Sequence, residues 1–127
     1  MINKIKPYRS VLYMPGANVR ALDKARTLPT DAIIFDLEDA VSVNEKITAR
    51  NNVNKALLQG GKWVGHIHFV DSNRRPVGLG HMQYGPIIDA LRQINYEGYL
   101  CAEAFPYPDA HEAARQTMRA YRYWTGN

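Results

Sequence analysis

Four strand-like segments alternate with four helix-like segments along this chain, and this alternation limits the folds that it can adopt. The second strand carries the run Ala-Ile-Ile-Phe at residues 32–35, which is apolar on both faces. Such a strand is typical of a parallel sheet that helices cover on both sides. The sequence therefore predicts an α/β fold with strands near residues 10–14, 31–37, 63–70 and 98–105 and helices near residues 18–28, 44–59, 84–94 and 109–124.

The length of the chain decides how much of such a fold it can complete. A closed (β/α)₈ barrel takes about 200–250 residues, and this chain has 127. Four βα units amount to half of a barrel, with the two halves of a single domain at residues 1–60 and 61–127 and the strand order 3-4-1-2. A half-barrel leaves sheet edges and an apolar face uncovered, so we expect a homodimer that closes the barrel. The alternative is an open, flavodoxin-like parallel sheet.

Charge and cysteine content narrow the classes of partner. The formal net charge is +4, but the basic residues are scattered, and the densest group is Arg115, Arg119 and Arg122 at helical spacing. This spacing is typical of a solvated helix face, so we expect no nucleic-acid partner. The apolar stretches are too short to span a membrane. The single cysteine, Cys101, cannot form an internal disulfide, which favours a cytoplasmic protein with a reduced thiol.

Two motifs in the first half appear in a fixed order. Residues 9–16 read Arg-Ser-Val-Leu-Tyr-Met-Pro-Gly, and residues 36–41 read Asp-Leu-Glu-Asp-Ala-Val. Residues 7–58 thereby resemble the beginning of the citrate lyase β-subunit family, which is HpcH/HpaI aldolase-like. The resemblance implies a (β/α)₈ barrel and a Mg²⁺-dependent carbon–carbon lyase acting on acyl-CoA or keto acids. Asp36, Glu38 and Asp39 match the acidic motif near its metal, whereas its later thioester- and metal-handling residues have no counterpart here.

The second half carries a His-x-His strand at residues 66–68, an Asn-Arg and Gly-x-Gly loop at residues 73–80, and Glu103 on the last strand. Residues two apart on a strand point to the same face, so His66 and His68 lie together. Mixed imidazole and carboxylate ligands suit Mn²⁺, Mg²⁺ or Co²⁺. Residues 63–123 thereby resemble the last two βα units of the xylose-isomerase-like family, which includes hydroxypyruvate isomerase and the ketohexose 3-epimerases.

This second resemblance assigns roles to four side chains. It implies that His68 and Glu103 bind the metal, that Glu103 also transfers a proton, and that Arg74 holds the substrate, with His66 lining the site. The family's remaining metal and acid–base residues lie on strands that this chain lacks, and Asp36 or Glu38 could stand in for one of them in a dimer. The alternative for His68 and Glu103 is a buried hydrogen-bonded pair without a metal.

Three functions follow from these observations. The leading prediction is a divalent-metal sugar isomerase or epimerase that acts through an enediolate on a small ketose or hydroxypyruvate. The second is a non-catalytic scaffold that recombines fragments of two barrels, whether natural or engineered. The third is a lyase of the citrate lyase type that acts on a keto acid or an acyl-CoA and uses the acidic residues 36–39.

Overall fold

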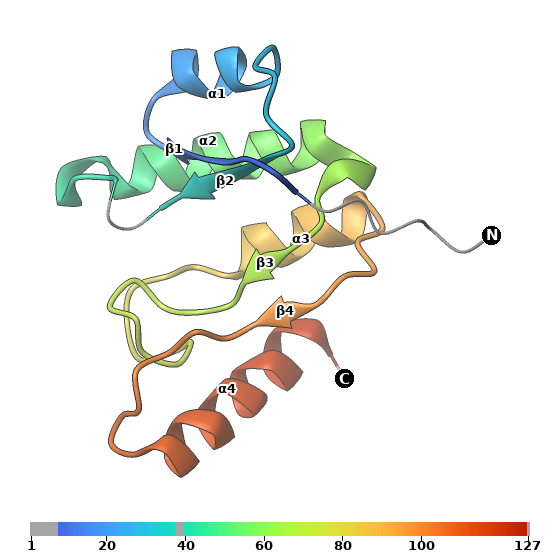
Figure 1. Cartoon of the computed structure of the whole chain (residues 1–127). Helices are drawn as coiled ribbons and strands as arrows, with labels where there is room; N and C mark the ends of the chain where they lie inside the picture. The colour runs from blue at the N-terminus through green and yellow to red at the C-terminus, as the bar shows by residue number, and fades with distance from the viewer. Residues whose placement is uncertain (1–7, 38–39, 127) are drawn as a thin grey trace. The chain divides into compact units, whose positions relative to one another are not determined.

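The structure is a computed structural model that describes residues 8–37 and 40–126 (Figure 1). The chain divides into two compact units, Met1–Ala56 and Leu57–Asn127. The elements of the described residues are, in chain order, β1 Val11–Pro15, α1 Val19–Ala25, β2 Ala32–Asp36, the 3-10 helix η1 Val43–Glu45, α2 Lys46–Gly60, the 3-10 helix η2 Gly61–Trp63, β3 Ile67–His68, α3 Gly85–Gln93, β4 Leu100–Cys101 and α4 Ala110–Thr125.

In the first unit β1 and β2 form a parallel pair, with Val11 opposite Ala32 and Pro15 opposite Asp36. Helix α1 begins after Asn18, whose side-chain oxygen accepts a hydrogen bond from the Ala21 amide at 3.0 Å. Figure 1 shows α1 over one face of this strand pair, where its apolar side packs on the strands. That core consists of buried residues from β1 and α1 with half-buried neighbours, namely Met14, Leu22, Ala25, Ala21, Ile33 and Phe35.

The amino-terminal ends of the two strands are joined by charge and hydrogen bonds. The Asp31 carboxylate accepts bonds from the backbone amides of Arg9 at 2.9 Å and Ser10 at 3.1 Å, and from the Arg9 guanidinium at 3.2 Å. The Asp31 side chain is only 8% exposed, so these bonds satisfy a carboxylate that is largely removed from water. This end of the strand pair is therefore structural, and the turns at the opposite end are open to other roles.

The opposite face of β1 and β2 differs from the sequence prediction. Residues 32–35 were expected to be covered on both faces, yet Ile34 is 39% exposed, and Val11 and Tyr13 on the same face are 47% and 65% exposed. The pairing brings these three side chains to one side of the sheet because alternate residues of a strand face the same way. The first unit thus has one apolar sheet face in its own core and one that is open.

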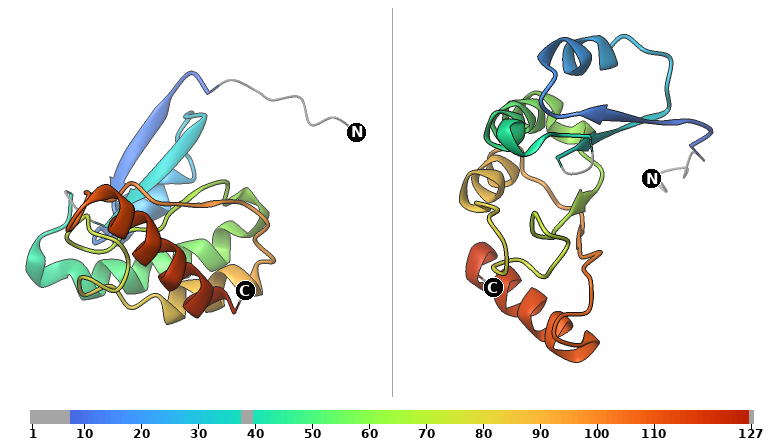
Figure 2. Two further views of the ribbon diagram at one scale, coloured as in Figure 1. Left: turned by 90° about the horizontal axis from the view of Figure 1, so that it is seen from below. Right: turned by 90° about the vertical axis from the view of Figure 1, so that its left-hand side faces the viewer.

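In the second unit β3 and β4 pair in parallel, with Ile67 opposite Leu100 and His68 opposite Cys101. Helices α3 and α4 lie on the same side of this strand pair (Figure 2). Their apolar faces enclose a core whose buried members are Phe69, Val77, Tyr84, Ile88, Leu91 and Ala120. This core is contributed by both helices, the end of β3 and the loop that follows β3.

The strands of the second unit are much shorter than the predicted segments 63–70 and 98–105. The ladder ends after the Phe69 amide donates to the Cys101 carbonyl at 2.7 Å. At the next residue the Tyr84 hydroxyl accepts from the Val70 amide at 2.9 Å and donates to the Val70 carbonyl at 2.7 Å. A side chain from the α3 segment thus occupies both backbone groups that strand pairing would otherwise use.

The loop after β3 is organised around the buried carboxylate of Asp71, which is 2% exposed. Its oxygens accept from the backbone amides of Ser72 at 2.7 Å, Gly78 at 2.9 Å and Met82 at 2.9 Å. Burial by itself raises the pKa of Asp71, but the amides of Met82, Ser72, Gly78 and Gly80 outweigh it and hold the pKa below its ordinary value. Asp71 therefore remains an anion, and it fixes three separate points of the loop.

The predicted parallel pairings of the first strand with the second and of the third with the fourth are confirmed. Among the described residues each unit contains one two-stranded parallel sheet, β1 with β2 and β3 with β4. The two-residue ladder of β3 and β4 offers few backbone groups for a further strand. The half-barrel therefore stays a prediction. Within the described residues, no helix has the length and apolar character needed to cross a membrane.

Candidate functional site

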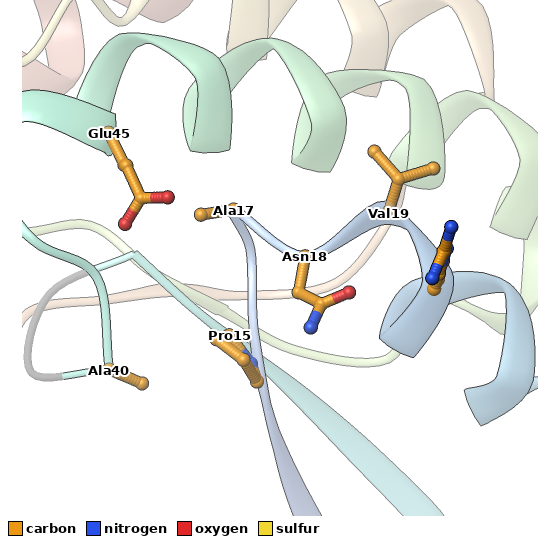
Figure 3. A pocket seen from close by; sticks show the side chains of 7 residues that line it. Pro15, Ala17, Asn18, Val19, Ala40 and Glu45 are labelled. Atoms are coloured by element: carbon orange, nitrogen blue, oxygen red, sulfur yellow. The ribbon is translucent and has the colours of Figure 1, made fainter.

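A shallow hollow of about 450 Å³ lies at the carboxyl ends of β1 and β2 in the first unit (Figure 3). In Figure 3, Ala40 and Glu45 lie on one side of it and Ala17 and Asn18 on the other. Ligands of parallel α/β folds bind at this end of the strands. The full lining comes from the turn after β1, the start of α1, and the segment between β2 and α2, namely Pro15, Ala17, Asn18, Val19, Arg20, Ala40 and Glu45.

The turn after β1 is held close to β2. The Gly16 amide donates to the Asp36 carbonyl at 2.8 Å, and the Asn18 amide donates to the Pro15 carbonyl at 3.2 Å. A Cβ atom on Gly16 would lie 2.8 Å from Val53 Cγ2 and 2.9 Å from Leu37 Cδ2, both closer than real Cβ contacts. The Pro-Gly pair that ends the motif at residues 9–16 forms this turn. Glycine is needed in it because the turn packs closely against α2 and the end of β2.

The acidic segment after β2 is only partly described. Asp36 Oδ2 accepts from the Ala40 amide at 3.2 Å. Glu38 and Asp39, two of the predicted site residues, lie outside the described residues. On the other side of this segment the Ser42 hydroxyl donates to Glu45 Oε2 at 2.7 Å, and the Glu45 amide donates to the Ser42 carbonyl at 3.0 Å. The carboxylates of Asp36 and Glu45 thus both take part in local hydrogen bonds.

The second predicted site lies in the other unit, on β3 and just beyond β4. The structure brings His68 and Glu103 together, with Nδ1 and Oε2 3.7 Å apart, and the rings of His66 and His68 meet edge to face at 5.2 Å. The side chains of His68 and Glu103 are 55% and 78% exposed. They are therefore not the buried hydrogen-bonded pair considered from sequence, because both are solvated and the distance exceeds hydrogen-bond range.

Arg74 lies in the Asp71 loop, where its backbone has φ 56°, a conformation in which few residues other than glycine are found. Its carbonyl accepts from the Phe105 amide at 2.6 Å, so it joins this loop to the segment after β4. The neighbouring Arg75 guanidinium stacks over the Tyr107 ring at 3.8 Å. These contacts give Arg74 and Arg75 a structural role in joining the two loops of the second unit.

Comparison with known proteins finds matches for the N-terminal region of the chain. Residues 9–66 match the family model of HpcH/HpaI aldolase/citrate lyase. The N-terminal region of this chain matches the HpcH/HpaI family. The predicted resemblance of residues 7–58 is therefore confirmed, whereas the resemblance of residues 63–123 to sugar isomerases stays a prediction.

Individual relatives agree with this family. The (3S)-malyl-CoA thioesterase of Cereibacter sphaeroides is 58% identical over 57 residues, which are 45% of this chain and 20% of that protein. Citrate lyase subunit beta of Escherichia coli is 46% identical over 54 residues, 42% of this chain and 18% of that protein. The corresponding subunit of Haemophilus influenzae is 45% identical over 53 residues, with the same shares. This chain therefore spans about a fifth of the length of these relatives.

The leading prediction, a divalent-metal sugar isomerase or epimerase, is wrong, because the matches are to aldolases, citrate lyases and a thioesterase, the class of the third hypothesis. Residues 8–37 and 40–126 also contain no group of three or more His, Cys, Asp and Glu side chains that could hold a metal. A His-x-His strand beside a carboxylate supplies too few ligands by itself, since hard divalent cations are bound by larger oxygen-rich sets.

Sequence reasoning missed most of the side chains around the hollow. Arg20, Lys46 and Asn52 carry no recognisable motif alone. Asn18 caps α1, at the start of the helix predicted near residues 18–28. For Arg20 the signal that could have found it is its place five residues after β1, whereas Lys46 and Asn52 lie 10 and 16 residues after β2 and no signal in the sequence points to them.

Proposed function

We propose that this chain is a citrate-lyase-type protein whose first unit binds an acyl thioester or a keto acid in the hollow at the ends of β1 and β2. The observation that supports this is a coincidence of position. All seven residues that line the hollow fall within residues 9–66, the segment that matches the family model. Two of the relatives carry names that refer to a CoA thioester or to citrate, and both types of compound are anionic.

The lining of the hollow suits an anionic ligand on one side. Arg20 is exposed at the start of α1 and supplies a permanent positive charge, since a guanidinium does not lose its proton in proteins. Asn18 contributes a carboxamide whose oxygen already accepts from the Ala21 amide. Glu45 is on the far side and accepts from Ser42. We therefore place the carboxylate or phosphate of the ligand near Arg20 and its neutral part toward Ala17 and Ala40.

The family resemblance also implies Mg²⁺, and the described residues alone do not fit such an ion. Near the hollow they bring only Asp36 and Glu45, and one oxygen of each is engaged by Ala40 or Ser42. No group of three acidic, histidine or cysteine side chains occurs in the described part of the chain. The proposal is accordingly a binding function, and no bond-breaking step is derived for these residues.

Self-association belongs to the same proposal. The face of β1 and β2 that carries Val11, Tyr13 and Ile34 is apolar and exposed, and parallel strands are normally buried on both faces. We infer that a second copy covers this face, as in the homodimer expected from the sequence. Sedimentation velocity of the wild-type chain tests this directly, and a single monomeric species at the concentrations used for titration would contradict it.

The binding proposal is tested by calorimetric titration of acetyl-CoA, and separately of oxaloacetate, into the purified chain. Arg20→Ala is expected to weaken the binding of the anion about tenfold, the size of one charge-assisted hydrogen bond. Lys24→Ala is the matched control, because Lys24 is an exposed cation on the same helix that does not line the hollow. An absence of binding by the wild type, or equal losses in the two variants, would refute the proposed site.

A further inference from the structure

Helix α2 hydrogen-bonds to the turn after β1 through the side chain of Asn52. The Asn52 side-chain amide donates to the Gly16 carbonyl at 3.2 Å and to the Ala17 carbonyl at 3.5 Å. Asn52 is half-buried, and its neighbour Val53 is the residue against which Gly16 packs. A carboxamide can donate two hydrogen bonds, so one side chain is able to hold two consecutive backbone carbonyls.

Those carbonyls belong to the residues that shape the hollow. Ala17 lines it directly, and Asn18 and Arg20 follow within three residues along the chain. The orientation of the turn therefore sets the direction in which the first residues of α1 face the hollow. Two backbone hydrogen bonds also hold the turn, from the Gly16 amide to the Asp36 carbonyl and from the Asn18 amide to the Pro15 carbonyl. In both of these bonds the turn donates through a backbone amide, whereas the Gly16 and Ala17 carbonyls of the turn accept from Asn52.

A second residue of α2, Lys46, hydrogen-bonds to the chain segment that leaves β2. The Lys46 ammonium donates to the Leu37 carbonyl at 3.0 Å, directly after the end of β2. Two polar side chains of one helix thus hold the chain segments that leave β1 and β2. Ala49 on α2 is buried, and Lys46 and Asn52 lie three residues before and after it, so they flank this buried position on its two sides.

We propose that Asn52 is a positioning residue for the hollow: it holds the turn after β1 so that Ala17, Asn18 and Arg20 face the bound ligand. This inference rests on the proposed function, because the effect of Asn52 on affinity requires that the hollow binds a ligand. It goes beyond the family match, since it assigns a specific role to a side chain outside the lining. Asn52 acts through the Gly16 and Ala17 carbonyls and has no contact with the ligand.

The test uses Asn52→Asp, which keeps the size of the side chain and replaces its donor by an acceptor. The matched control is Asn51→Asp, which makes the same change of charge at the preceding, exposed residue of α2. Acetyl-CoA is titrated into each full-length variant at a temperature where circular dichroism shows all of them folded. We expect Asn52→Asp to weaken binding about tenfold, Asn52→Gln to recover part of that loss, and Asn51→Asp to leave the affinity within about twofold of the wild type.

Two further measurements distinguish the proposed positioning role of Asn52 from a purely structural role. In the Arg20→Ala background the loss caused by Asn52→Asp should shrink, because a misplaced turn costs less when the Arg20 contact is already absent. Amide hydrogen exchange at Gly16 and Asn18 should accelerate in Asn52→Asp with no ligand present. Asn52→Asp with unchanged affinity would overturn the proposal even if acetyl-CoA binds. If the wild type does not bind, the proposed function fails, and unchanged exchange in Asn52→Asp would then refute the positioning role independently.

Discussion

The Asp71 carboxylate offers the sharpest test of how the second unit is held together. Replacing Asp71 by Asn preserves the size of the side chain but removes the charge and one of the two acceptor oxygens. Both oxygens are in use, since Oδ1 accepts from Ser72 and Met82 and Oδ2 accepts from Gly78. The new amide nitrogen must therefore face at least one buried backbone N–H that has lost its acceptor.

The size of the effect follows from these contacts. A hydrogen bond to a charged group contributes about 1.5–3 kcal/mol, and a buried donor left without an acceptor costs about 1–3 kcal/mol. Because the contributions overlap, we expect Asp71→Asn to lower the free energy of unfolding by about 2–4 kcal/mol, a large part of the stability of a typical domain. For a chain of this size that corresponds to a fall of about 10 °C in Tm.

The assay is urea unfolding at pH 7, followed by tryptophan fluorescence, since Trp124 packs against the core of this unit. Asp89→Asn is the matched control: Asp89 is 65% exposed and pairs with Arg92 at 3.4 Å, so it should change stability by less than about 1 kcal/mol. If Asp71→Asn and Asp89→Asn are destabilised equally, the carboxylate does not organise the loop and the reasoning is refuted.

Two further predictions concern pH and the turn after β1. Because the folded state lowers the pKa of Asp71, the stabilisation by its carboxylate is present above the unfolded pKa of about 3.9 and is lost as the pH falls through the lower folded value. In urea unfolding from pH 7 to pH 2, the difference in the free energy of unfolding between wild type and Asp71→Asn should shrink only below about pH 4. A difference that stays constant over this range would contradict the prediction. Gly16→Ala should lower the free energy of unfolding by about 1–3 kcal/mol through overpacking against Val53 and Leu37. Gly65→Ala, where a Cβ meets nothing within 4 Å, should be close to neutral in the same urea unfolding assay.

The sequence was most informative in the first half of the chain. The motifs at residues 9–16 and 36–41 predicted the family, and the comparison confirmed it for residues 9–66. In the second half an equally ordered set of residues led to the sugar isomerase prediction, which is wrong. His66, His68 and Glu103 do come close together, so the spatial inference held. The step from two histidines and a carboxylate to a metal enzyme needed further ligands that the described residues do not supply.

The hollow shows why a site is harder to predict than the elements around it. Its ends could be anticipated, because polar residues after parallel strands gather at one edge of a sheet. The hydrogen bonds of Asn52 could not, since nothing in the local sequence says which turn a side chain on a following helix will reach. The Asn52 bonds to Gly16 and Ala17 join residues more than 30 positions apart.

What the sequence alone determined were features whose causes are local: the continuous apolar runs that form β1 and β2, the helix start at Asn18, and the four helices at their predicted places. The tertiary structure decided the lengths of β3 and β4, because the Tyr84 hydroxyl takes the backbone groups of Val70 and stops the ladder. It also decided the conformation of the loop after β3, where one buried carboxylate accepts hydrogen bonds from backbone amides of residues up to 11 positions away. Propensity acts between neighbours in the chain, whereas a buried polar group must find its partner wherever packing places one.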